Sequence, residues 1–164
     1  MAKNHAREKE IWLVYYRKGS GKRRLAYNVA VEEALCYGWI DSVLKTIDAE
    51  SFAQRFTPRR PGAEWSAMNV ERFRRLVKQG KVTKAGLAAA EGVTGKRADI
   101  APDILRRLKR DETTWKNFQR FPASYKRIRI AWVEGARSRP EVFEQRLKHF
   151  LKMTSQNKRY GMVQ

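Results

Sequence analysis

The hydrophobic positions near the start of the chain predict two helices. The first is expected over about 6–18, where length and a charged lead-in favour a helix, although the apolar run Ile11–Tyr16 would also suit a buried strand. The second is expected over about 28–37, because its apolar residues share one helical face and Gly38 can end it in the left-handed conformation.

The middle of the chain alternates short mixed segments with helical patterns. Segments 43–47 and 52–57 combine apolar and polar residues around a polar turn, which predicts a small β-hairpin. A helix is expected from residue 67 to Gly80, and Thr83 can cap a short helix that follows it.

The last third of the chain contains three helical patterns, each beginning at or near a proline, where proline is tolerated. They predict a three-helix unit, and the glycines and mixed charge of 92–101 indicate a hinge before it. We therefore expect a mainly α protein, a compact helical domain over 1–164 with one small β-hairpin. Its subregions would be a motif-bearing part, 1–91, and the three-helix part, 102–153.

The charge of the chain favours anionic partners. Its 164 residues include 36 Lys and Arg against 17 Asp and Glu, which leaves a net charge of +19. The first ten residues are too polar for a signal peptide, and no apolar run approaches the ~20 residues that span a bilayer. We therefore expect a cytoplasmic location and no membrane insertion.

Metal, cofactor and thiol chemistry are not expected. Cys36 is the single cysteine, which excludes an internal disulfide and a thiolate cluster, and its place on an apolar helical face favours packing over reactivity. His5 and His149 lie far apart without a carboxylate pattern around them. The basic loop 19–24 lacks the spacing of a phosphate-binding loop. No metal site, cofactor or catalytic residue is therefore assigned.

Rigid and charged residues are concentrated in 33–69, and the sequence places the candidate site there. The end of a helix should make Trp39 and Asp41 project from the turn that follows it. Farther along, flanking prolines stiffen the segment that carries Arg59 and Arg60. Forked guanidinium donors on a stiff segment suit the carboxylate or phosphate of a ligand.

A helix start beside these arginines adds to the preference for an anion. Ser66 is the expected N-cap, and the free N–H groups of a helix start attract negative charge. The full candidate binding set is Trp39, Asp41, Arg55, Arg59, Arg60, Trp65, Ser66 and Asn69.

Each of these assignments has a structural alternative. Trp39 and Trp65 would equally serve as buried anchors for the hairpin, and capping explains Ser66 and Asn69. Asp41 is the best candidate acid or base, but an Asp bridged to an Arg is also an ordinary way to fix a turn, and we favour that role. The residues therefore favour a protein that is not an enzyme.

Several segments resemble the YdeI/OmdA family, named for bacteriocin protection, YdeI or OmpD-associated. The most specific are the GWIDS and RFTPRRP sequences, which join rare residues in fixed order. The resemblance implies a bacterial, cytoplasmic protein with a part in tolerance of antimicrobial peptides, and it supplies no established chemistry. The similar segments are 12–21, 32–42, 54–69 and 82–89, with a fainter one over 117–147.

These observations lead to one functional hypothesis and two alternatives. The hypothesis is a YdeI/OmdA-like protein that supports tolerance of cationic peptides through a small anionic ligand or an acidic protein partner, because like charges prevent a basic protein from sequestering such peptides directly. The first alternative is sequence-independent nucleic-acid binding through basic clusters such as 106–110 and 126–129. The second is an enzyme that acts on a small anionic substrate.

Overall fold

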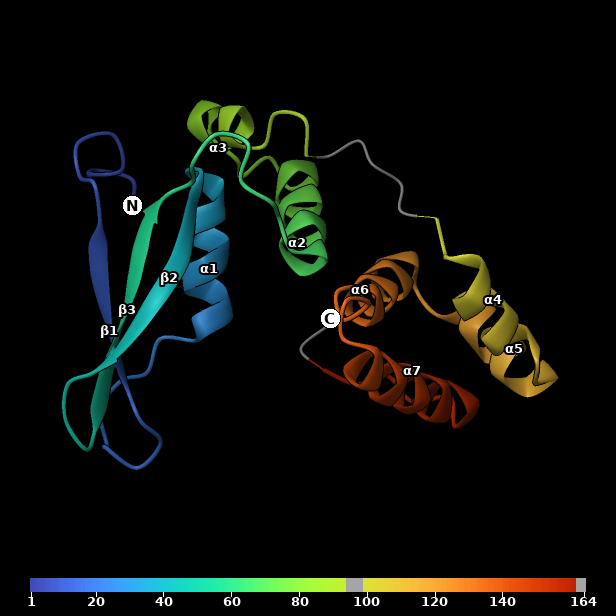
Figure 1. Ribbon diagram of the computed structural model, residues 1–164. Helices are drawn as coiled ribbons and strands as arrows, with labels where there is room; N and C mark the ends of the chain where they lie inside the picture. Colours follow the sequence, from blue (N-terminus) through green and yellow to red (C-terminus); the bar gives the residue numbers. More distant parts are fainter. Residues whose placement is uncertain (94–98, 162–164) are drawn as a thin grey trace. The chain divides into compact units, whose positions relative to one another are not determined.

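The chain divides into two units, Met1–Gly95 and Lys96–Gln164, in a computed structural model (Figure 1). The structure describes residues 1–93 and 99–161. Part of the expected hinge, 92–101, lies outside the described residues. Each unit has its own hydrophobic core and is described by itself.

The described part of the first unit is a three-stranded antiparallel sheet with three helices. The strand order is β1-β3-β2, so the expected hairpin forms two of the strands and a third strand completes the sheet. The fold class expected from the sequence, a mainly α protein with one small hairpin, is therefore wrong, and the chain is a mixed α and β protein. The elements are β1 (Ile11–Tyr16), α1 (Tyr27–Cys36), β2 (Trp39–Thr46), β3 (Ser51–Pro58), α2 (Ala67–Lys78) and α3 (Lys84–Ala89).

The segment expected as a first helix is strand β1. It pairs along its whole length with β3, from Ile11 opposite Phe56 to Tyr16 opposite Ser51. Its side chains alternate, since Tyr15 is buried in the core whereas Trp12 is 43% exposed. This alternation of exposure and the β-branched and aromatic composition suit a strand, and pairing with β3 overrides the helical lead-in.

Helix α1 lies against one face of the sheet, and the first core forms between them (Figure 1). Tyr15, Trp39 and Phe56 come from the three strands, and each is at most 4% exposed. Ala34 and Leu35 of α1 are fully buried against them. The helix was expected at this place, and its apolar face is the one that the sequence pattern indicates.

Close packing fixes the turn between α1 and β2. Gly38 has a φ of +76°, as expected for a residue that ends a helix in the left-handed region. A Cβ at this position would lie 2.8 Å from the Cβ of Ala89 in α3. Thr83 caps α3 as expected, and its hydroxyl also donates to the carbonyl of Cys36 over 2.8 Å. The end of α1, the start of β2 and α3 therefore form one packed junction.

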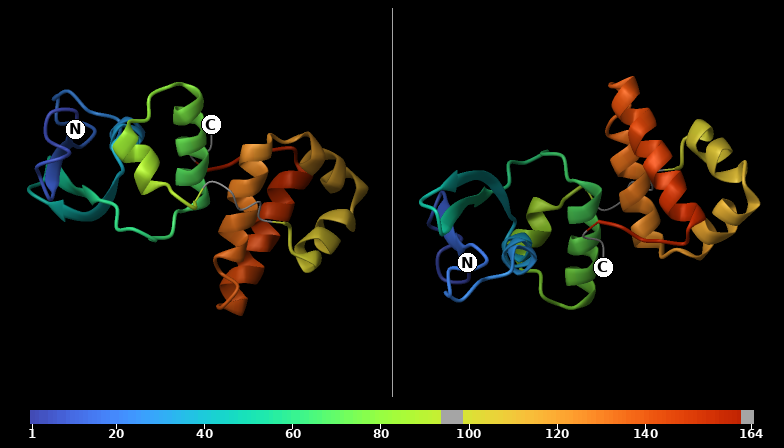
Figure 2. Two further views of the ribbon diagram at one scale, coloured as in Figure 1. Left: turned by 90° about the horizontal axis from the view of Figure 1, so that it is seen from above. Right: turned by 90° about the horizontal axis from the view of Figure 1, so that it is seen from below.

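The second unit is a bundle of four helices whose described residues share one core (Figures 1 and 2). The three expected patterns give four helices, because Asp111 interrupts the first pattern and accepts a hydrogen bond from the Thr114 N–H over 2.7 Å as an N-cap. Among the described residues, none of the helices combines the length and the apolar composition that a bilayer span requires. The helices are α4 (Pro102–Lys109), α5 (Glu112–Arg120), α6 (Ala123–Glu134) and α7 (Pro140–Ser155).

Candidate functional site

Arg59 is fixed at the point where β3 ends. Its backbone N–H donates to the carbonyl of Gly38 over 2.9 Å, and its guanidinium carbon lies 4.0 Å from the ring centre of Trp65. Nη1 donates to the carbonyl of Glu64 over 3.4 Å, but the buried Nε has no acceptor. Burial lowers the pKa of Arg59, and the charge of Asp41 acts in the opposite direction. The ordinary pKa of arginine is so high that the guanidinium keeps its charge near neutral pH.

Trp65 holds the arm between β3 and α2 in place. Its ring packs edge-on against Phe73 of α2, with 5.1 Å between the ring centres, and the guanidinium of Arg59 lies over the same ring. The indole is half-buried, so it anchors the arm and also supports the arginine.

Ser66 and Asn69 are occupied by structural hydrogen bonds. The Ser66 hydroxyl accepts from the Asn69 N–H over 3.3 Å, which confirms Ser66 as the N-cap of α2. The Asn69 side-chain oxygen accepts from Arg72, which also donates to Asn28 of α1 over 2.6 Å. These bonds join the start of α2 to α1.

Asp41 has a partner that the sequence did not indicate. The hydroxyl of Tyr27, the first residue of α1, donates to Oδ2 of Asp41 over 2.6 Å. Burial and then this hydrogen bond raise the pKa of Tyr27 to about 12. The contact joins the start of α1 to β2, and only the packing of the helix on the sheet brings the two residues together.

The two faces of the sheet separate the candidate residues. Asp41 is opposite Phe56 in the register of β2 and β3, so both side chains are on the α1 side. Arg55 is the neighbour of Phe56 and projects from the other side, where its Nε donates to Glu10 over 2.7 Å. Trp39 is 2% exposed and belongs to the core.

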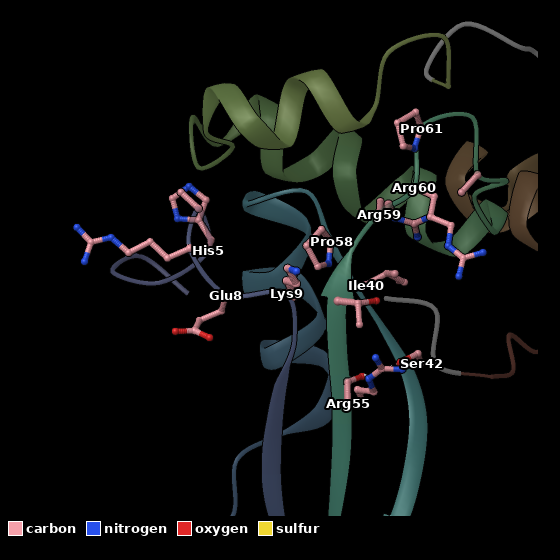
Figure 3. Close-up of a pocket in the computed structure, with 14 residues that line it drawn as sticks. His5, Glu8, Lys9, Ile40, Ser42, Arg55, Pro58, Arg59, Arg60 and Pro61 are labelled. Carbon is pink, nitrogen blue, oxygen red and sulfur yellow. Dashed lines mark hydrogen bonds between the residues drawn. The ribbon is translucent and has the colours of Figure 1, made fainter.

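An open hollow of about 870 Å³ lies at the ends of β2 and β3. Figure 3 shows Arg59 and Arg60 on the segment that follows β3 and Arg55 on the strand itself, while His5, Glu8 and Lys9 come from the chain before β1. Among the candidate residues, only these three arginines line the hollow. Its charged lining consists of Arg7, Lys9, Arg55, Arg59 and Arg60 against Glu8.

The described residues offer little for metal or thiol chemistry. Within 1–93 and 99–161, no group of three or more His, Cys, Asp and Glu side chains could hold a metal ion. Cys36 is buried, and burial followed by the charge of Glu33 raises the pKa of its thiol. A thiol held in its protonated form is a poor nucleophile.

Two family models match the chain. Residues 1–89, more than half of the chain, match the domain of unknown function DUF8412. Residues 97–157 match the family described as bacteriocin-protection, YdeI or OmpD-associated. The chain belongs to the DUF8412 family and carries a YdeI/OmdA domain. No curated protein and no solved structure matches it.

The YdeI/OmdA domain occupies the second unit of the chain. The resemblance noted in the sequence is therefore correct for the family, but the family model covers its fainter segment, 117–147. The more specific segments, from 12–21 to 82–89, fall within the DUF8412 match. The basic hollow also belongs to the DUF8412 part, so the description of the YdeI/OmdA family assigns no role to it.

Proposed function

We propose that the first unit binds a small anionic ligand in the hollow beside Arg59 and Arg60. The observation that carries this proposal is the charge of the lining, which combines five Lys and Arg side chains with one carboxylate, that of Glu8. Guanidinium groups bind carboxylates and phosphates through forked, charge-assisted hydrogen bonds. A carboxylated or phosphorylated small molecule is the ligand that suits this surface.

Arg59 and Arg60 are the main ligand-binding residues in this proposal. Arg55 is neutralised in part by its ion pair with Glu10. Trp65 already holds the Arg59 side chain, so little side-chain freedom is lost when a ligand binds. The Nε of Arg59 also has no hydrogen-bond acceptor. Arg60 is exposed and adds a second charge next to it.

The biological role that we propose is indirect support of tolerance toward cationic antimicrobial peptides or bacteriocins in a bacterial cytoplasm. The description of the YdeI/OmdA family, which names bacteriocin protection, motivates this role. A net charge of +19 repels cationic peptides, so direct sequestration is not expected. The anionic ligand, or an acidic protein that presents the same chemistry, would connect the chain to that response, and no catalysis is required.

A comparison of sulfate with chloride tests the site. Thermal unfolding is measured at equal ionic strength for the natural chain and for the Arg59→Ala, Arg60→Ala double variant. A sulfate concentration one hundred times the Kd should add about 2.7 kcal/mol to the free energy of unfolding if sulfate binds only the folded chain. We expect this sulfate-specific increment to decrease strongly in the double variant.

The matched control carries an equal loss of charge outside the hollow. Arg106→Ala, Arg110→Ala changes two exposed arginines of the second unit and should keep the sulfate increment. If both double variants respond to sulfate as the natural chain does, the effect does not depend on Arg59 and Arg60, and ion exclusion or another anion site explains it. The ligand site at Arg59 would then be rejected.

A further inference from the structure

Arg129 is a buried cation enclosed by aromatic rings in the second unit. Its side chain is 6% exposed on α6, and its guanidinium carbon lies 4.7 Å from the ring centre of Tyr160. The rings of Tyr125 and Trp132 lie at 5.8 and 5.7 Å. These two residues are four before and three after Arg129 on the same helix, so the three side chains share one face.

The structure gives Arg129 no negative partner among residues 1–93 and 99–161. Arg129 takes part in none of the ion pairs between described residues, and its Nε is buried without an acceptor. Contact with aromatic faces offsets part of the cost of burying a cation. A buried charge nevertheless requires paired hydrogen bonds, because it has lost its water. Within the described residues, the enclosure therefore offers this charge no negatively charged acceptor.

A second buried polar group lies against this guanidinium. The hydroxyl of Tyr160 is buried, and burial raises its pKa, while hydrogen bonding to the Arg129 side chain and the charge of Arg129 act in the opposite direction. The Tyr160 N–H donates to the hydroxyl of Tyr125 over 3.4 Å, so the chain after α7 is attached to the same face of α6. The Nε of Arg129 and the O–H of Tyr160 are therefore two donors that a single bound anion can contact.

The surroundings of this pair are positively charged. Arg159 precedes Tyr160 and acts electrostatically on Tyr125, while His149 of α7 packs edge-on against Tyr160 with 4.5 Å between ring centres. Gly161 covers the guanidinium, and a Cβ there would lie 3.0 Å from Nη1, so backbone alone closes this side. Among residues 1–93 and 99–161, no carboxylate pairs with Arg129, Arg159 or Tyr160, so a bound anion would meet several donors there.

We propose that Arg129, Arg159 and the hydroxyl of Tyr160 form an anion site in the YdeI/OmdA domain that binds a phosphate group. Phosphate suits the site better than a carboxylate does, because it has more acceptor oxygens and a higher charge for two guanidiniums. The half-buried rings of Trp132 and Tyr160 border the site, so a nucleotide or a nucleic-acid backbone could supply the phosphate as well as a free ion.

Phosphate binding is measured by titration calorimetry on the full chain at constant ionic strength. All variants carry Arg59→Ala and Arg60→Ala, so that the proposed hollow of the first unit does not contribute and failure of one site leaves the other testable. Removing a hydrogen bond to a charged group should weaken phosphate binding about tenfold in Tyr160→Phe and in Arg159→Ala. Arg129→Met should abolish binding.

Tyr160→Phe keeps the aromatic ring and Arg159 is exposed, so these two variants decide the outcome even if Arg129→Met fails to fold. Arg106→Ala is the matched control and should bind phosphate as the background does. Adenosine monophosphate and a short oligothymidylate identify the source of the phosphate. If either one binds more tightly than inorganic phosphate and depends on the same residues, the phosphate belongs to a nucleotide or to a nucleic acid, respectively. Equal phosphate affinity in all four variants, or no phosphate-specific heat in the background chain, would overturn the proposal.

Discussion

The Tyr27 hydroxyl donates a 2.6 Å hydrogen bond to the carboxylate of Asp41 and thereby joins the first turn of α1 to strand β2. Tyr27 is 38% exposed, so this bond lies at the edge of the core, where water can compete with it. The two residues are 14 positions apart and belong to different elements. The bond helps to set where α1 begins on the sheet.

The ionisation of Tyr27 should be displaced to high pH. Burial and the bond to Asp41 raise its pKa from 10.0 to about 12, so the protonated hydroxyl is the form that the folded chain favours. A group with a raised folded pKa stabilises the fold below its unfolded pKa and loses that contribution as pH rises. The difference in unfolding free energy between the natural chain and Tyr27→Phe should therefore shrink between pH 10 and 12.

Ultraviolet titration of tyrosine ionisation checks this prediction. The difference between the natural chain and Tyr27→Phe should contain one transition centred near pH 12. Tyr16→Phe is a control on another half-buried tyrosine of the same unit. A transition of Tyr27 centred near pH 10 would show that the hydrogen bond does not persist in solution.

Arg59→Ala should cost about 1 kcal/mol of unfolding free energy. The variant loses the contact with Trp65, and a cation over an exposed aromatic ring contributes about 0.5–1 kcal/mol. The hydrogen bond to the Glu64 carbonyl is long, at 3.4 Å, and adds little. Urea denaturation of the two chains measures the loss.

The size of that loss separates two roles for Arg59. If Arg59 were the required ion-pair partner of a buried Asp41, its removal would cost about 3–5 kcal/mol, because the carboxylate would be left uncompensated. Arg59→Lys is the matched variant, since it keeps the charge and loses the planar stacking on Trp65. Arg59 belongs to the scaffold if Arg59→Ala loses about 3–5 kcal/mol of unfolding free energy and Arg59→Lys keeps the stability of the natural chain. That outcome would remove Arg59 from the ligand hypothesis.

Gly38→Ala and Gly80→Ala should differ in their cost, although both glycines have positive φ. The values are +76° for Gly38 and +66° for Gly80, so each alanine carries the strain of the left-handed region, about 1–2 kcal/mol. Nothing lies within 4 Å of a Cβ at Gly80, whereas at Gly38 it would meet the Ala89 Cβ at 2.8 Å and the Ala85 carbonyl oxygen at 3.0 Å. Gly38→Ala should therefore lose clearly more stability in chemical denaturation. Equal losses would indicate that α3 moves away from the turn without cost.

Local signals in the sequence predicted local structure well. Ser66 and Thr83 cap the helices that follow them, and Gly38 ends α1, because capping depends on a few adjacent residues. Strand β1 was misassigned because its partner, β3, lies about 40 residues away, and a six-residue apolar run has no period that excludes a helix. The break at Asp111 was missed because apolar residues continue on both sides of it.

The candidate site depended on tertiary contacts that no local pattern contains. The sequence grouped Asp41 with Arg55, but β3 presents Arg55 on the face opposite to the one that carries Asp41. Lys9 and Arg7 were not selected, because their contribution to the hollow follows from the path of the chain before β1. Tyr27 lies just before the helix expected over 28–37, and Arg129 belongs to the basic cluster 126–129. The contact of Tyr27 with Asp41 and the aromatic enclosure of Arg129 depend on the fold.

Nucleic-acid binding, where it occurs, should be electrostatic and indifferent to base sequence. The net charge of +19 comes from basic residues in both units, and exposed arginines and lysines such as Arg106, Lys109 and Arg110 supply phosphate contacts without reading bases. With about six phosphate contacts, the logarithm of the association constant should fall with the logarithm of salt concentration at a slope near −5 for duplex DNA. Fluorescence anisotropy with one labelled duplex and its scrambled counterpart measures this slope.

The double variant Arg106→Ala, Arg110→Ala should make the slope less steep by up to about two units, because each lost phosphate contact removes roughly one released counterion. A strong preference for one duplex near physiological salt would contradict this prediction, since counterion release carries no sequence information and base contacts would then have to exist.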